Sequence, residues 1–492
     1  MFRNYLAIAV FAAGATSLWA QATPDLKTVV DNSLKAMGAA DVKTLTISGE
    51  GWDGCVGQPY DPYSPNWRRF SNKNYVRAID LEARGWRLQR VRGEGENPGR
   101  GGCNAGPVFD QTQNQVTMAG TEAPWNTQLE YILLPEGFLK VALEKNATVK
   151  EEKIKGKKYT VVSFPGDNKS PVTGYINDMG YVDRVETMIN NDVLGDMVWD
   201  ATYTDWKDFG GLKFPTRILQ HQGGPAYFEL SVSDVKANAP VDLTQPPGRG
   251  RGGRGGAGGP GRGRGPEGPM SEDLGGGFWL VTGGYAAIVG DFKDYIVVVE
   301  GPQNDMRAEQ IIAEAKHLVP NKPIRYVINT HTHFDHAGGL RAFVAEGATI
   351  VTYQSNKKYY ETALTRSHTL VPDKMAGMSP QPKVKVETVG EKKVMTDGEH
   401  TIEIYHVDNS THSSNMLIVY LPKQKVLLEA DEFNVGAANA PTPNPVNPYH
   451  TNLLANIERL HLDVDRIIPV HLPNDGRKVT MAELYTAAGK QK

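Results

Sequence analysis

Four side chains of the kind that bind metal ions occur within six residues of the sequence: His331, His333, Asp335 and His336. They come directly after the apolar run at 324–328, which predicts a short buried strand. In an extended segment, residues two positions apart point to the same side, so His331 and His333 can bind one ion together. Asp335 and His336 follow where the chain turns toward the next predicted helix, and they can bind a second ion. This H-x-H-x-D-H pattern predicts a site for divalent metals.

The pattern closely resembles the signature of the metallo-β-lactamase superfamily, and the resemblance extends over roughly residues 277–492. An exposed polar loop is the alternative, but His makes up only 12 of the 492 residues, so chance clustering is a poor explanation. The resemblance implies an αββα sandwich with further metal ligands at the ends of later strands. These are implied to be His412, Asp431 and His471, although a capping, turn or surface role is the alternative for each.

The resemblance also implies how the ligands divide between two ions. The first ion would be bound by His331, His333 and His412, the second by Asp335, His336 and His471, and Asp431 would bridge the two. Zinc β-lactamases typically have Cys or Ser at or near the bridging position, whereas the lactonases and glyoxalase II-like hydrolases of the superfamily have Asp. No Cys follows Cys103, so the ligands are nitrogen and oxygen atoms, which suit zinc and also iron or manganese.

Two divalent ions about 3.5–4 Å apart can share a water and lower its pKa from about 15.7 to about 7. By resemblance, this metal-bridging hydroxide attacks the substrate, and Asp335 orients it through its free carboxylate oxygen. The Pro-rich loop at 433–450 could overhang the ions, so Tyr449 or His450 could protonate the leaving group. The predicted function is a dinuclear metal-dependent hydrolase whose substrate is a small ester, lactone, thioester or lactam.

Two other functions stay open from the sequence. The N-terminal half could be a periplasmic carrier of lipophilic molecules, with the metal domain as an accessory. A mononuclear iron enzyme resembling persulfide dioxygenases is the other alternative. Nucleic acid is not an expected partner, because 53 basic and 56 acidic side chains leave a net charge of only -3.

The first residues have the parts of a secretory signal peptide: a cation at Arg3, an apolar run at 5–15 and an Ala-Gln-Ala site ending at Ala22. The run is shorter than the about 20 apolar residues that cross a bilayer. We therefore expect an exported protein, periplasmic or secreted, without stable membrane insertion. In an oxidising compartment, Cys55 and Cys103 are predicted to form a disulfide, with two unrelated thiols as the alternative.

The elements that must position these residues fall into two halves. Residues 246–269 contain 12 Gly, 5 Arg and 5 Pro, and such a segment buries too little to offset its ordering entropy. It predicts a flexible linker. The expected organisation is a signal peptide at 1–22, a β-rich domain at 23–245, a linker at 246–277 and the metal-binding domain at 278–492.

Before the linker, apolar and polar residues alternate with period two, which predicts a meander of antiparallel strands with helices near 25–37 and 135–144. A long sheet of this kind resembles the half-barrel of periplasmic lipoprotein carriers. After the linker, strands alternate with helices such as 305–318, which predicts α/β layers. The expected fold class is therefore a two-domain α+β chain, an antiparallel β half-barrel with helices followed by the αββα sandwich. The oligomeric state is not predicted.

Overall fold

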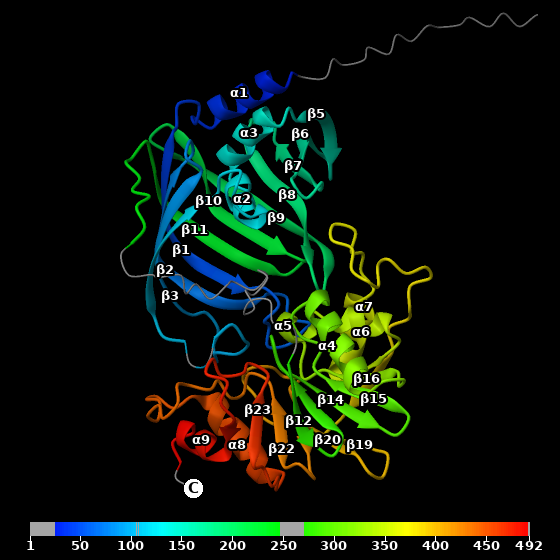
Figure 1. Ribbon diagram of the computed structural model, residues 1–492. Coiled ribbons are helices and arrows are strands. Elements are labelled where there is room, and N and C mark those ends of the chain that lie inside the picture. Colours follow the sequence, from blue (N-terminus) through cyan, green and yellow to red (C-terminus); the bar gives the residue numbers. More distant parts are fainter. Residues whose placement is uncertain (1–24, 105, 107, 247–269, 491–492) are drawn as a thin grey trace, which may run out of the picture.

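The computed structural model describes residues 25–104, 106, 108–246 and 270–490. The predicted signal peptide and residues 247–269 of the predicted linker lie outside the described residues. Figure 1 shows a curved sheet with helices in the first half of the chain and a layered α/β part in the second half. The expected two-part α+β organisation is confirmed at this level. The end of the predicted linker is not a linker, because residues 271–275 pair with the next strand.

The first half is built on one sheet of eleven strands, and all neighbouring strands in it are antiparallel. Its spatial order is β4-β3-β2-β1-β11-β10-β9-β8-β7-β6-β5, so the first and last strands pair in the middle. The strands are β1 (Thr44–Cys55), β2 (Arg68–Asp80), β3 (Gly85–Glu94), β4 (Gln111–Met118), β5 (Thr148–Ile154), β6 (Lys157–Pro165), β7 (Pro171–Ile176), β8 (Val182–Asn191), β9 (Gly195–Phe209), β10 (Leu212–Gln222) and β11 (Ala226–Ala237).

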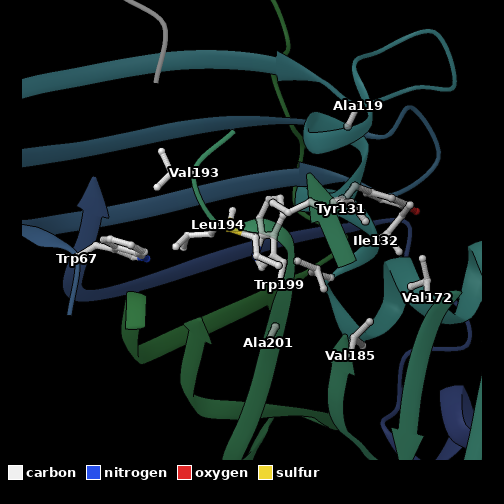
Figure 2. Close-up of a cluster of buried hydrophobic side chains, with 14 of the residues drawn as sticks. Trp67, Ala119, Tyr131, Ile132, Val172, Val185, Val193, Leu194, Trp199 and Ala201 are labelled. Carbon is white, nitrogen blue, oxygen red and sulfur yellow. The ribbon is translucent and has the colours of Figure 1, made fainter. Parts of the chain in front are cut away.

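Three helices belong to this half: α1 (Leu26–Ala36), α2 (Trp125–Ile132) and α3 (Pro135–Glu144). The Asp25 side chain caps α1 by accepting from the Thr28 N–H, and Pro135 begins α3, where its missing N–H costs nothing. In Figure 1, α2 and α3 lie on the hollow side of the curved sheet. Tyr131 of α2 and Trp199 of β9 are labelled together in the buried cluster of Figure 2.

The second half contains two sheets. The first runs in the order β12 (Ser271–Gly275), β13 (Phe278–Val281), β14 (Ala287–Phe292), β15 (Tyr295–Val299), β16 (Ile324–Ile328), β17 (Thr349–Tyr353) and β18 (Val386–Val389). The second runs in the order β19 (Lys392–Thr396), β20 (Thr401–His406), β21 (Leu417–Leu421), β22 (Val426–Glu429), β23 (Arg466–Pro469) and β24 (Val479–Thr480). The helical segments are α4 (Asp305–Leu318), α5 (Phe334–Ala337), α6 (Leu340–Ala345), η1 (Gln354–Asn356), α7 (Lys357–Ala363), α8 (Pro448–Arg459) and α9 (Met481–Ala487).

Buried apolar clusters show how these layers pack. One cluster joins α4 and α6 to the outer face of the first sheet, through residues such as Ile311 and Val298. A second cluster fills the space between the two sheets, with Val297 from one and Val419 from the other. A third packs α8 and α9 on the far face of the second sheet. The side chains of β15 and β21 therefore alternate between two cores, as their continuous burial indicates.

Parallel strand pairs bring the ends of distant segments together. β15 and β16 are parallel in the first sheet, and β22 and β23 are parallel in the second. Because the carboxyl ends of parallel strands lie at the same edge of a sheet, the residues that follow β22 and β23 are neighbours. The residues that follow β15 and β16 are neighbours for the same reason. Asp431 and His471 come from one pair of ends, and the H-x-H-x-D-H segment comes from the other.

The two halves are in direct contact. The expected disulfide between Cys55 and Cys103 is present, and it joins the end of β1 to the segment between β3 and β4. Between the two halves, the Trp67 and Phe334 rings pack edge to face with their centroids 5.5 Å apart. Within the described residues, no helix has both the length and the apolar character needed to cross a membrane.

Candidate metal centre

The side chains of all seven predicted ligands converge at one place. Their nitrogen and oxygen atoms form two groups, and within each group the atoms lie no more than 4.8 Å from one another. The first group comprises His331, His333, His412 and Asp431, and the second comprises Asp335, His336, His471 and Asp431. Asp431 therefore lies between the two groups, where the resemblance had implied a bridging residue.

The three histidines of the first group are buried. His333 Nδ1 lies 2.9 Å from His412 Nε2, and His412 Nε2 lies 3.1 Å from Asp431 Oδ2. His331 Nε2 points at the same carboxylate oxygen from 3.4 Å. The His331 and His333 side chains are 0 % exposed, and His331 Nε2 makes no hydrogen bond among the described residues. A buried nitrogen without a partner costs free energy unless something binds it, and a divalent cation fits this position.

The second group is more open. His336 Nε2 lies 3.2 Å from His471 Nε2 and 3.0 Å from Asp431 Oδ2. His471 Nε2 lies 2.9 Å from the other oxygen of Asp431 and 3.7 Å from Asp335 Oδ2. The side chains of Asp335 and His471 are 29 % and 34 % exposed, whereas His336 is fully buried. Solvent therefore reaches the centre from the side of Asp335 and His471.

The electrostatics of the two groups differ. Burial and the neighbouring His412 lower the pKa of His333 to about 3, and burial also holds the pKa of His331 well below its usual value. These imidazoles are therefore neutral, as metal ligands must be. Burial alone would lower the pKa of His336 too, but the charges of Asp431 and Asp335 outweigh it and hold this pKa well above its usual value. The negative charge of Asp431 and Asp335, which favours a proton on His336, also favours a metal cation bound at the second group.

Asp431 adopts a backbone conformation that residues other than Gly rarely take. Its φ is +66°, and Glu300, which lies behind the second group, has a φ of +77°. Such conformations cost roughly 1–3 kcal/mol and are concentrated at functional sites. At Asp431 the unusual backbone occurs in the loop directly after β22, where the carboxylate meets both groups of ligand atoms.

Several partners of the ligands were not found from the sequence. Glu300 Oε2 accepts a hydrogen bond from His336 Nδ1 at 3.1 Å, and Glu300 Oε1 accepts from the Thr330 N–H at 2.8 Å. Glu300 lies at the end of β15, next to the end of β16, and this position in the sequence could have indicated that it contacts the ligands. Gln58 and Pro59 also contact ligands, at Asp335 and His333. They precede the motif by more than 270 positions, and no local pattern connects them to it.

Tyr449 and His450 do not occupy the positions expected of a proton donor. The Tyr449 ring packs edge to face on His412 with centroids 5.4 Å apart, but its hydroxyl donates to the Gly101 carbonyl at 3.2 Å. His450 is turned toward the interior of the second half, where its ring packs on Phe433 and its Nε2 lies 3.3 Å from the Asn447 amide nitrogen. The cause is that both residues lie in the first turn of α8 and do not belong to an overhanging loop. His450 is therefore not grouped with the ligands.

A comparison with protein-family models agrees with the expected resemblance of the second half. Residues 299–471 match the model of the metallo-beta-lactamase superfamily. Among solved structures, the chain is similar to the metallo-β-lactamase FIM-1 from Pseudomonas aeruginosa in its mono-zinc form, with 17% identity, a TM-score of 0.34, and coverage of 45% of this chain and 94% of that chain. It is also similar to a metallo-β-lactamase from Hirschia baltica, with 21% identity, a TM-score of 0.34, and coverage of 46% of this chain and 100% of that chain. No curated protein matches the chain.

Proposed function

We propose that the protein is an exported hydrolase that uses two divalent metal ions to cleave a small ester, lactone, thioester or lactam. The observation that carries this proposal is the pair of ligand groups that share Asp431. A single buried cluster would support one ion. Two clusters joined by one carboxylate support a pair of ions held a short distance apart.

The residues present fit such ions. The donor set is five imidazoles and two carboxylates, which suits zinc, with iron or manganese as alternatives. When bound, two such ions would act as Lewis acids and would lower the pKa of a shared water toward neutrality. The chain itself keeps the His331 and His333 rings neutral and holds His336 in place through Glu300. No residue of the chain needs to act as a covalent nucleophile.

Asp335 is the ligand best placed to face the substrate, because it lies at the open side of the centre. Its Oδ2 is directed toward His336 and His471, at 3.6 and 3.7 Å. Its Oδ1 accepts a hydrogen bond from Gln58, and the remaining lone pair on this oxygen is available to orient a water. The proton for the leaving group would then come from solvent on the same open side.

Metal content measured together with hydrolysis tests the proposal. The purified chain should contain two zinc equivalents and should hydrolyse at least one member of a panel of nitrocefin, acyl-homoserine lactones, thioesters and phosphodiesters. A chelator should abolish the activity, and zinc should restore it. The variant Asp431→Asn should lose activity by orders of magnitude, whereas Asp294→Asn, at the exposed turn between β14 and β15, should not. One iron per chain with no hydrolysis would instead support the persulfide dioxygenase alternative.

The proposal extends to the rest of the chain. We assign the N-terminal sheet to a half-barrel of the lipoprotein-carrier kind and the second half to an αββα sandwich, with a periplasmic or secreted location. The disulfide between Cys55 and Cys103 supports export, because such bonds persist mainly in oxidising compartments. Detection of the mature chain in a periplasmic or culture fraction tests the proposed location.

A further inference from the structure

A short segment of the first half of the chain touches the metal centre in the second half. Three consecutive residues of this segment, 57–59, each make one hydrogen bond to the H-x-H-x-D-H segment. The Gly57 carbonyl accepts from the Phe334 N–H at 3.1 Å, Gln58 Nε2 donates to Asp335 Oδ1 at 2.6 Å, and the Pro59 carbonyl lies 2.9 Å from His333 Nε2. Two of these three bonds end on predicted metal ligands.

The bond to Pro59 determines which nitrogen of His333 carries the proton. A carbonyl oxygen can only accept, so the ring must place its N–H at Nε2. Nδ1 is then left with a lone pair, and this is the atom that faces His412 Nε2 at 2.9 Å. A partner of this kind fixes both the tautomer and the orientation of a ligand. Here the partner is a backbone atom from the other half of the chain.

The bond to Gln58 orients Asp335. Gln58 is 6 % exposed, and its amide donates to Oδ1, while the Tyr285 hydroxyl lies 3.3 Å from Oδ2. Rotation of the carboxylate would break the bond to Gln58. The amide therefore keeps Oδ2 directed toward His336 and His471, where the second ion would bind.

The segment is held in place from its other side. The Cys55–Cys103 disulfide joins it to residues 101–103, and the Gly102 N–H donates to the Gln58 carbonyl at 3.2 Å. The Gly101 N–H donates to the Thr411 carbonyl at 2.9 Å, next to the ligand His412. Gly102 lies so close to the centre that a Cβ there would be 2.8 Å from His333 Cε1. We call residues 55–59 and 101–103 together the disulfide clamp.

We propose that the disulfide clamp is part of the metal centre, and that Gln58 is a positioning residue for Asp335 and thus for the second metal ion. This inference rests on the proposed function, because it assumes that Asp335 binds a metal. The contact made by the disulfide clamp differs from the other packing between the halves. Other bonds that cross between the halves, such as that from the Tyr63 hydroxyl to the Ser355 carbonyl at 3.2 Å, touch no ligand.

The test compares metal binding by the full chain in two variants. Gln58→Met keeps the size of the side chain and removes its donor, and Tyr63→Phe removes one crossing hydrogen bond that touches no ligand. Zinc affinity is measured by competition with a chelating dye, and the absorption bands of bound cobalt report the geometry of each position. Gln58→Met should bind one of its two zinc equivalents about 10–100-fold more weakly, with altered cobalt bands, and Tyr63→Phe should match the wild type.

Gln58→Asn is a second variant that keeps a polar side chain, in case the apolar replacement impairs folding. Its amide is one methylene shorter and cannot make the 2.6 Å bond to Asp335 Oδ1, so it should weaken the same zinc equivalent. Wild-type affinity and cobalt bands in either folded Gln58 variant would overturn the inference and leave the proposed hydrolase intact. A wild-type chain that binds no second metal ion would overturn both.

Discussion

Glu300 and His336 form a fully buried pair, in which His336 Nδ1 donates to Glu300 Oε2 at 3.1 Å and neither side chain is exposed. The opposite nitrogen of the same ring faces His471 and Asp431. The carboxylate therefore fixes the tautomer that leaves Nε2 available as a ligand. The Pro59 carbonyl, from the other half of the chain, likewise fixes the tautomer of His333, and there it leaves Nδ1 available.

Replacing Glu300 should weaken metal binding without unfolding the chain. Glu300→Gln keeps an oxygen for the Thr330 N–H but removes the charge that orients His336. We expect one zinc equivalent to bind about 10–100-fold more weakly in a chelator competition assay. Glu309→Gln, on the exposed face of α4, is the matched control. Equal zinc affinities in the two variants would contradict this role.

Replacing Gly102 of the disulfide clamp with alanine should disturb the metal centre. Its carbon would lie 2.0 Å from Gln58 Oε1 and 2.8 Å from His333 Cε1, so either Gln58 or the ligand must move. We expect Gly102→Ala to lower zinc affinity by about tenfold or more. Gly120→Ala is the control, because a Cβ there meets nothing within 4 Å. Identical zinc titrations for both alanine variants would show that the clamp is not in contact with the centre.

Removing the disulfide should destabilise the chain. The bond closes a loop with a sequence separation of 48. The chain-entropy model assigns such a loop about 4 kcal/mol. The double variant Cys55→Ser/Cys103→Ser should lose about that free energy of unfolding in urea, and wild type in reductant should behave like it. If reductant left the wild-type transition unchanged, the bond would not constrain the fold.

Glu136 makes the stability of the first half depend on pH. Burial raises the pKa of its carboxyl from 4.5 to about 7, and neither oxygen has a hydrogen-bond partner among the described residues. A folded pKa above the unfolded one means that the full stability is present below about pH 4.5 and is lost as the pH rises through about 7.

Glu136→Gln should therefore raise the free energy of unfolding near pH 9 by up to roughly 3 kcal/mol and change it little near pH 5. Urea unfolding at both pH values, followed by tryptophan fluorescence, measures the difference. Exposed Glu122→Gln serves as the control and should show no such dependence on pH. The same gain at both pH values would mean that ionisation of Glu136 is not the cause.

The sequence predicted most elements of the fold, because their patterns are local. The helix at 305–318 has the bounds expected from its apolar spacing, and Pro135 correctly predicted the start of α3. β4 and β5 have no such local pattern. They are the two edge strands of the large sheet. Their residues are mostly polar, partly buried in β4 and mostly exposed in β5, and they show no apolar alternation.

Four of the seven candidate ligands could be chosen from the motif itself, because their side-chain types and spacing suit metal binding. The other three were implied by the family resemblance, which places further ligands at the ends of later strands. What only the tertiary structure decided is which groups hold those ligands in place. The bond from Gln58 to Asp335 joins residues 277 positions apart. Such a contact depends on how two separately patterned halves pack against each other, and no periodicity in either half records that packing.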